Sequence, residues 1–248
     1  MQNKLFELKN VKKEFNQDMV ALNDINLTIN KGVTVIIGPS GSGKSTLLRT
    51  LNLLEKPTSG NIYYNDNDIT SNDYNLQTHR KEVGMVFQHF NLFPHLSVLE
   101  NLNLAQIDVL NKTKEEASKN SIKYLKQVGL LDKKDSYPTK LSGGEKQRIA
   151  IARSLTMDPK TILFDEPTSA LDPEMVKEVL LVMKYLANLG INMIIVTHEM
   201  GFAKTIADEI IVMDKGNVIE KGSSDDIFIN SKNNRTKSFL EAINIDNL

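Results

Sequence analysis

The sequence contains no cysteine in its 248 residues. This absence excludes disulfide bonds and cysteine-ligated metals, and it fits a reducing compartment. Long apolar runs are also missing: none approaches the roughly 18–20 residues that cross a bilayer, and the first residues lack the apolar core of a signal peptide. We therefore expect a soluble chain that reaches a membrane only through a partner.

The sequence has almost no net charge, because 30 basic residues balance 31 acidic ones to give −1. A balanced charge gives no broad attraction to nucleic acid, so we expect no nucleic-acid partner. Apolar residues make up 40% and charged residues 25%, an ordinary mixture for a globular protein. The length allows one large core, or a core with a subdomain.

Short apolar runs alternate with helical patterns along much of the chain. They are continuous, as in strands buried on both faces of a parallel sheet. The runs are "TVII" at 34–37, "TILF" at 161–164, "NMIIV" at 192–196 and "EIIVM" at 209–213. Strands that alternate with helices of about 10–15 residues predict βαβ units and an α/β fold with a mainly parallel sheet.

A helical pattern with few strand signals occupies the middle of the sequence, from about residue 90 to residue 157. We interpret this pattern as an insertion in the α/β core. The predicted organisation is one domain over 1–248, with the core formed by 1–88 and 158–248 and the helical insertion by 89–157.

The stretch "GPSGSGKST" follows the first buried run and precedes a helical pattern of leucines. It matches G-x-x-x-x-G-K-[ST], and strand–loop–helix is the context in which this motif binds nucleoside triphosphates. Backbone N–H groups would hold the phosphates, Lys44 would reach the β and γ phosphates, and the Ser45 hydroxyl would bind Mg²⁺. The candidate nucleotide-binding residues are Gly38, Pro39, Ser40, Gly41, Ser42, Gly43, Lys44, Ser45 and Thr46.

The run at 161–164 ends in two acids, Asp165 and Glu166. Ligands of open parallel sheets bind beyond the carboxyl ends of the strands, so both side chains are expected to face the phosphates. We predict that Asp165 holds Mg²⁺ through water and that Glu166 orients and activates the attacking water. Taken alone, the pair could instead cap a helix before Pro167.

Two further candidate residues follow strand-like runs. His198 ends "MIIVTH", where it could donate a hydrogen bond to the γ-phosphate. Gln88 follows "EVGMVF", where its side chain could contact Mg²⁺ or the attacking water. The remaining histidines, His79, His89 and His95, are interpreted as structural or surface residues.

The stretch "LSGGEKQR" carries a second anion-binding pattern. Ser142 and Glu145 form a capping box at a helix start, which by itself explains those two residues. Capping does not explain Gly143 and Gly144, which would bring two bare N–H groups to an anion at a helix N-terminus. Because one chain cannot easily fold this element over its own phosphate loop, we predict a head-to-tail dimer in which each chain completes the other's site.

These motifs, in this order, resemble the nucleotide-binding subunit of an ABC transporter, and the likeness covers essentially the whole chain. The resemblance implies a P-loop NTPase core of the RecA-like type, an N-terminal antiparallel β subdomain and an inserted α-helical subdomain. It implies hydrolysis of ATP with Mg²⁺ and stacking of Phe15 on adenine. It also implies that "SALD", Ser169–Asp172, joins the two active sites of a dimer, with Asp172 beside the nucleotide.

Finer detail resembles the polar amino acid importers of the glutamine and histidine uptake type, in "LNLLEKPTSG", "GMVFQHFNLFPHLSVLEN", "VTHEMGFAKTIAD" and "NRTKSFL". This branch implies membrane permease subunits, an extracytoplasmic solute-binding protein, and either a homodimer or a pair with a related ATPase subunit. It also implies a peripheral place on the cytoplasmic face of the membrane. The sequence departs from the branch at Glu145 and Lys146, where glutamines are common, and at Ser231, where a proline is usual.

The stretch "HFNLFPHLSVL" holds more apolar side chains than a small helical insertion can bury. Some of them are expected to form an exposed groove, and the resemblance suggests a short cytoplasmic helix of the membrane subunit as its ligand. The alternative is that they belong to the core of the insertion. The residues concerned are Phe90, Leu92, Phe93, Leu96 and Val98.

Other functions remain compatible with the ATPase motifs. The cargo could be another small solute, and an export or lipoprotein-release system would use the same motor. An ABC-type ATPase of DNA repair would carry long coiled coils, and one of translation would carry two such domains in tandem. The sequence shows neither feature.

Overall fold

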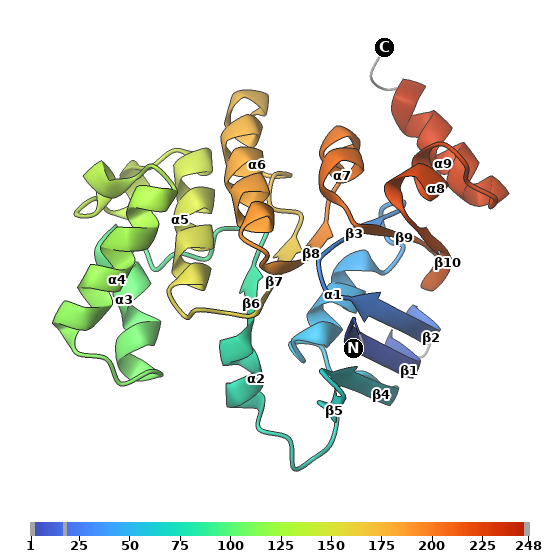
Figure 1. Ribbon diagram of the computed structural model, residues 1–248, viewed down its shortest axis with the longest axis horizontal. Coiled ribbons are helices and arrows are strands. Elements are labelled where there is room, and N and C mark those ends of the chain that lie inside the picture. The colour runs from blue at the N-terminus through green and yellow to red at the C-terminus, as the bar shows by residue number, and fades with distance from the viewer. Residues whose placement is uncertain (1–2, 17–18, 246–248) are drawn as a thin grey trace. The chain divides into compact units, whose positions relative to one another are not determined.

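The computed structural model describes residues 3–16 and 19–245 (Figure 1). The chain divides into two compact units. The first unit comprises Met1–His79 with Asn192–Leu248, and the second comprises Arg80–Ile191. Within the described residues, no helix is long and apolar enough to cross a membrane.

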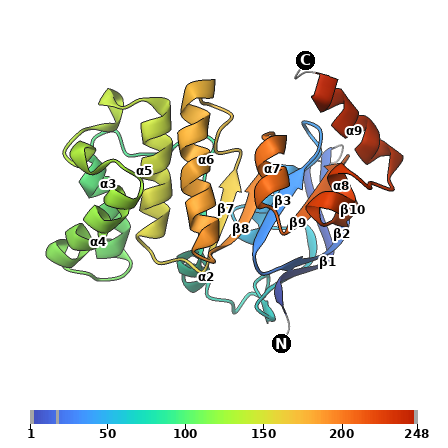
Figure 2. The ribbon, with the colours of Figure 1, turned by 45° about the horizontal axis from the view of Figure 1, so that its top comes forward.

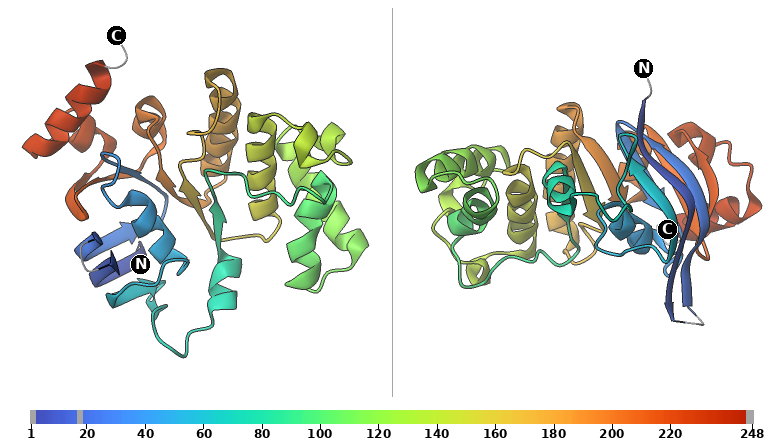
Figure 3. Two further views of the ribbon diagram at one scale, coloured as in Figure 1. Left: turned by 180° about the vertical axis from the view of Figure 1, so that it is seen from behind. Right: turned by 90° about the horizontal axis from the view of Figure 1, so that it is seen from below.

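An antiparallel sheet forms one part of the first unit. Its strands are β1 (Lys4–Asn16), β2 (Met19–Asn30), β4 (Ser59–Tyr64) and β5 (Asn67–Asp68), in the order β2-β1-β4-β5. Strands β1 and β2 form a long ribbon (Figure 3). The predicted alternation of β2 is confirmed, because Leu22, Ile25, Leu27 and Ile29 are buried between exposed or half-buried neighbours. One face of this ribbon therefore packs in a core and the other meets solvent.

Parallel strands form the other part of the first unit. The strands β3 (Val33–Ile37), β8 (Asn192–Val196), β9 (Glu209–Asp214) and β10 (Asn217–Gly222) lie in the order β10-β9-β3-β8. β3 runs parallel to both β8 and β9, and β10 returns antiparallel to β9. Every residue of β3 is buried, as the continuous apolar run predicted. Helix α1 (Lys44–Leu51) follows β3, and α7 (Met200–Ile206) follows β8.

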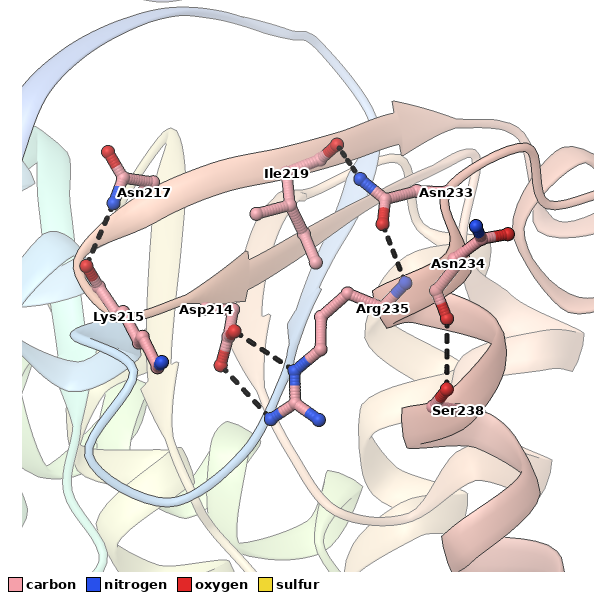
Figure 4. Close-up of polar contacts among 8 residues, drawn as sticks. All are labelled: Asp214, Lys215, Asn217, Ile219, Asn233, Asn234, Arg235 and Ser238. Atoms are coloured by element: carbon pink, nitrogen blue, oxygen red, sulfur yellow. Dashed lines mark hydrogen bonds and ion pairs between the residues drawn. The ribbon is translucent and has the colours of Figure 1, made fainter.

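Near the end of the chain, α8 (Ser224–Phe228) packs on the β9–β10 hairpin, and α9 (Asn234–Ile245) follows α8 (Figure 2). Asn233 donates from Nδ2 to the Ile219 carbonyl at 3.0 Å and accepts from the Arg235 N–H at 2.8 Å. The Arg235 guanidinium pairs with Asp214 at 3.0 Å (Figure 4). Ser231, where importers of the resembled branch usually have proline, donates to Glu220 at 2.7 Å. Residues 231–235 thus fix the start of the last helix to the β9–β10 hairpin.

The second unit contains a parallel strand pair and a group of helices. The strands are β6 (Val83–Val86) and β7 (Thr161–Asp165), and the short helix α2 (Leu76–Glu82) precedes β6 at the boundary between the units. The longer helices are α3 (Val98–Asp108), α4 (Lys114–Gln127), α5 (Gly143–Leu155) and α6 (Pro173–Asn188). This unit is wider than the insertion expected at 89–157, because it also holds the strand pair and α6.

Three helices of the second unit begin with the same capping arrangement. In each, a serine or threonine accepts from the backbone three residues on, and a glutamate there accepts from the cap backbone. Such a cap stabilises a helix by about 1 kcal/mol. The pairs are Ser97 with Glu100, Thr113 with Glu116, and Ser142 with Glu145.

Candidate nucleotide-binding and hydrolysis site

The phosphate-binding motif forms a tight loop between β3 and α1 in the first unit. Gly38, Gly41 and Gly43 all have positive φ angles, of 145°, 75° and 98°. Residues other than glycine rarely adopt a positive φ angle, so the backbone conformation of the loop requires glycine at these three positions. An added Cβ at Gly38 would also collide with the Met213 carbonyl oxygen, and one at Gly43 with the Ala21 carbonyl oxygen.

Lys44 folds over this loop and is only 4% exposed. Its ammonium donates to the carbonyls of Gly38 and Pro39, each at 2.9 Å. Within the described part of the chain, the buried Ser42 Oγ has no hydrogen-bond partner. A buried hydroxyl without a partner is costly unless a ligand satisfies it, so the loop has the donors of an anion site.

His198 lies on the same sheet edge as the phosphate loop. β3 pairs in parallel with β8, and Ile36 lies opposite Val196. The loop begins at Gly38, two residues beyond Ile36, and His198 follows Val196 at the same distance along the chain. The two candidate features therefore emerge from one carboxyl edge, and the His198 side chain is exposed there.

Gln88 and the two acids lie at the carboxyl ends of a second pair of parallel strands, in the second unit. β6 pairs in parallel with β7, and Val86 lies opposite Phe164. Asp165 ends β7 and is 2% exposed, whereas Glu166 is half-buried. Glu166 has a φ of 47°, which is uncommon for a residue with a side chain, and strain of this kind clusters at functional sites. Ser169 helps to hold this turn by donating from Oγ to the Glu166 carbonyl at 3.0 Å.

The stretch "LSGGEKQR" begins α5, and its capping box is present as the sequence allowed. Glu145 accepts from the Ser142 N–H at 2.8 Å and pairs with Lys133 at 3.2 Å. The Ser142 N–H, followed by the Lys133 ammonium, lowers the pKa of the Glu145 carboxyl. The cap is therefore ionised at neutral pH.

Packing gives Gly143 and Gly144 a second explanation that the sequence does not reveal. A Cβ at Gly143 would lie 3.0 Å from Leu171, and one at Gly144 would lie 2.9 Å from the Cβ of Met175. The Gly144 N–H also points to the Met175 sulfur at 3.3 Å. The glycines let α5 approach α6 closely, while their N–H groups remain at a helix N-terminus.

Three other predicted site residues, Phe15, Ser169 and Asp172, are exposed to solvent. Phe15, in β1, is 45% exposed, and the Lys13 ammonium lies 4.9 Å from the centre of its ring. Ser169 and Asp172 are exposed in the loop that leads to α6, and Asp172 is the N-cap residue of that helix.

The apolar stretch after Gln88 divides between core and surface. Val98 is fully buried, whereas Phe93 is 42% exposed and faces a cavity of about 470 Å³. We call this cavity the docking groove; it is lined by, among others, Gly84, Phe93, Leu104, Val109, Arg153 and Met157. Phe90, Leu92 and Leu96 are half-buried. Val98 thus belongs to the core, whereas Phe93 lines an exposed groove, and the binding of a partner there stays a prediction.

The remaining histidines are either buried or at the surface. His79 is 1% exposed, and its Nε2 lies 2.8 Å from the Leu51 carbonyl oxygen, so it is a structural residue. His89 and His95 are exposed.

A glycine loop between a parallel strand and a helix, with acids ending another buried strand, defines the P-loop class of nucleotide-binding proteins. The family described as "ABC transporter" matches residues 22–169, more than half of the sequence. The chain belongs to this family, as an ATP-binding subunit that hydrolyses ATP.

Individual proteins of known identity give the same result. The chain is 51% identical to the arginine transport ATP-binding protein ArtM of Bacillus subtilis, over 96% of this chain and 100% of that one. It is 50% identical to the glutamate/aspartate import ATP-binding protein GltL of Escherichia coli, over 96% and 99%.

Solved structures agree on the fold. The chain resembles cbiO1 of Clostridium perfringens, part of an ABC transporter complex, with a TM-score of 0.82 and 31% identity, over 98% of this chain and 96% of that one. It also resembles a dimeric ATP-binding cassette bound to ADP and Pi, with a TM-score of 0.79 and 35% identity, over 89% and 99%.

Proposed function

We propose that this chain is the ATPase subunit of an importer for polar amino acids. The observation that carries this assignment is identity of 50% or more, over 96% of the chain, to ATP-binding proteins named for arginine and for glutamate/aspartate transport. Because relatives with different cargo are equally similar, the proposal stays at the class of polar amino acids.

The first unit supports the binding of ATP. The glycines of the phosphate loop have positive φ angles, and the buried Ser42 hydroxyl of the same loop has no partner among the described residues. Lys44, at present on loop carbonyls, is placed to exchange them for phosphate oxygens. Phe15, exposed on β1, is available to stack on adenine.

The proposed metal ligands are Ser45, Gln88 and Asp165. Their hydroxyl, amide and carboxylate oxygens are the hard donors that Mg²⁺ prefers. When bound, Mg²⁺ would neutralise phosphate charge during phosphoryl transfer. Glu166 would orient and activate the attacking water, and His198 would donate a hydrogen bond to the γ-phosphate.

A head-to-tail dimer would complete each site. The N-terminus of α5, with Ser142, Gly143 and Gly144, would contact the nucleotide held by the second copy or by a related ATPase subunit. The exposed loop Ser169–Asp172 would join the two sites, with Asp172 beside the nucleotide. The likeness to a dimeric cassette supports this arrangement.

The docking groove is the proposed contact with the membrane permease. Its apolar lining, including the half-exposed Phe93, would receive a short helix of that partner. The chain would then act at the cytoplasmic face of the membrane, with an extracytoplasmic solute-binding protein as an indirect partner. Closure around ATP would move the groove and thereby the membrane gate.

The test is uptake of labelled amino acids by cells that carry Lys44→Ala in place of the native chain. We expect selective loss of uptake of one polar class, such as glutamine, glutamate or basic amino acids. Lys31→Ala, which changes an exposed lysine of the same unit, is the control and should retain uptake. Normal uptake of every amino acid by the Lys44→Ala cells would contradict the assigned cargo.

A further inference from the structure

The segment 87–97 joins β6 to α3 and, although fully described, contains neither helix nor strand. It includes Gln88 and Phe93, so it passes from a proposed catalytic residue to the docking groove. A loop without regular structure needs other partners for its backbone groups. Here, buried or half-buried side chains of neighbouring helices bind many of these backbone groups.

Two of these side chains come from α5, the helix that begins at the signature glycines. Gln147 is fully buried, and its Nε2 donates to the Phe87 carbonyl at 3.3 Å. Arg153 donates from Nη1 to the Asn91 carbonyl at 2.8 Å and from Nη2 to the Phe90 carbonyl at 3.3 Å. Together they hold the backbone on both sides of Gln88.

Arg153 also reaches the docking groove. It lines that groove, and its guanidinium lies 5.9 Å from the centre of the Phe93 ring. Burial lowers the pKa of Arg153, yet an arginine in a protein stays charged, so its bonds to the two carbonyls are charge-assisted. Because one planar guanidinium donates to two successive carbonyls, it fixes both the position and the direction of the backbone at Phe90 and Asn91.

The far end of the segment is held from α3. Asn101 is 1% exposed, accepts from the Phe93 N–H at 2.8 Å, and donates to the carbonyls of Phe93, Leu96 and Ser97 at 3.1, 3.1 and 2.9 Å. Asn101 therefore shapes the groove, while Gln147 and Arg153 hold the part that contains Gln88.

We propose that Gln147 and Arg153 are positioning residues, which attach the backbone around Gln88 to α5. The helix that carries Ser142–Gly144, the residue Gln88 and the docking groove then move as one body. A partner in the groove would shift Gln88 and the signature glycines together. This inference rests on the proposed functions of Gln88 and of the groove.

The test is a double-mutant cycle on the full chain, with kcat and KM for ATP as readouts. Arg153→Met keeps much of the side-chain volume but removes both donors, and Gln147→Met does the same for the other contact. We expect each to lower kcat about tenfold, with KM nearly unchanged. In a Gln88→Ala background, neither should lower kcat further, because both act through Gln88.

Arg148→Met is the matched control. Arg148 lies on the same helix but pairs with Glu178 of α6 at 2.7 Å. In the double variant, the fold-changes in kcat caused by Arg148→Met and by Gln88→Ala should multiply, whatever the size of each. If the effects of Arg153→Met and Gln147→Met also multiply with that of Gln88→Ala, their role is merely structural and the proposal is wrong.

The outcomes separate this inference from the proposed function. If Gln88→Ala lowers kcat while Arg153→Met and Gln147→Met do not, only the inference fails. If Gln88→Ala leaves kcat unchanged although Lys44→Ala abolishes hydrolysis, the proposed role of Gln88 is wrong and the inference falls with it.

A spectroscopic measurement keeps the proposal testable if one variant folds poorly. The sequence has no cysteine, so His89→Cys, at an exposed position, gives a single site for a spin label. The label should become more mobile when combined with Arg153→Met or Gln147→Met, and not with Arg148→Met. Equal mobility in all three would overturn the proposal.

Discussion

The molecule contains two glycine-rich helix N-termini, and they use glycine for different reasons. At the phosphate loop, Gly38, Gly41 and Gly43 adopt positive φ angles that other residues rarely take. At the start of α5, neither Gly143 nor Gly144 is among the described residues of positive φ, and both face α6 closely.

The two N-termini also differ in how their backbone groups are satisfied. Helix α1 begins at Lys44, and its N-cap residue, Gly43, has no side chain with which to cap it. Helix α5 has the complete box of Ser142 and Glu145. The N–H groups at the start of α1 therefore depend on a ligand for hydrogen bonds. The start of α5 is already stabilised by its own capping box, so it can contact a partner without needing one to fold.

The largest expected effect is that of Gly38→Ala. The new Cβ would meet the Met213 carbonyl, which is backbone and cannot turn away, at a φ of 145°. We expect more than about 4 kcal/mol of destabilisation and loss of ATP binding. Urea unfolding and titration with a fluorescent ATP analogue would measure both. Stability within about 1 kcal/mol of the native chain would show that the loop is more adaptable than its geometry indicates.

Gly144→Ala should have a smaller effect, and one that can be reversed. Its new Cβ would meet the side chain of Met175, so we expect about 1–3 kcal/mol of overpacking cost. In a Met175→Gly background, which removes the Met175 Cβ that the new atom would meet at 2.9 Å, the same change should cost clearly less. Urea unfolding of the four chains tests this, and equal costs in both backgrounds would refute the packing explanation.

Gly41→Ala separates conformation from packing within the phosphate loop. Apart from its two chain neighbours, no described residue has an atom within 4 Å of a Cβ added at Gly41, so only its φ of 75° opposes the change. We expect a cost of about 1–2 kcal/mol, and less for Gly41→Asn, because asparagine tolerates this conformation better. Thermal unfolding measures both, and a larger cost for asparagine than for alanine would contradict this account.

The smallest effect is that of charge at the second helix N-terminus. Glu145→Gln keeps a capping acceptor but loses the pair with Lys133, so we expect the native chain to be more stable by about 0.5–1 kcal/mol at pH 7. Because folding lowers the pKa of Glu145, this advantage is present above the unfolded pKa and disappears as the pH falls below about 4. A difference that persists at pH 2.5 in urea unfolding would exclude this cause.

Local features of the fold were predictable from the sequence. The buried strands, the phosphate loop and the capping box of α5 each depend on neighbouring residues, and the structure confirms all three. The parallel pairing of β6 with β7 agrees with the predicted mainly parallel sheet.

Contacts between distant residues were not predictable. Gly144 and Met175, which are in contact, are 31 positions apart in the sequence. The two hydrogen bonds from Arg153 to the loop after Gln88 join residues that are 62 and 63 positions apart. No local pattern encodes such pairs. The sequence also could not show that Val98 is buried whereas Phe93 is exposed, because both residues are apolar.

The central claim is that the two N-termini belong to one composite site formed by two chains. Its most direct test is the molar mass of Glu166→Gln by light scattering, with and without saturating ATP and Mg²⁺. This variant should bind ATP without hydrolysing it, so the account predicts a dimer with ATP and a monomer without it, and no dimer when Lys44→Ala is added. A monomer at saturating ATP would contradict the claim.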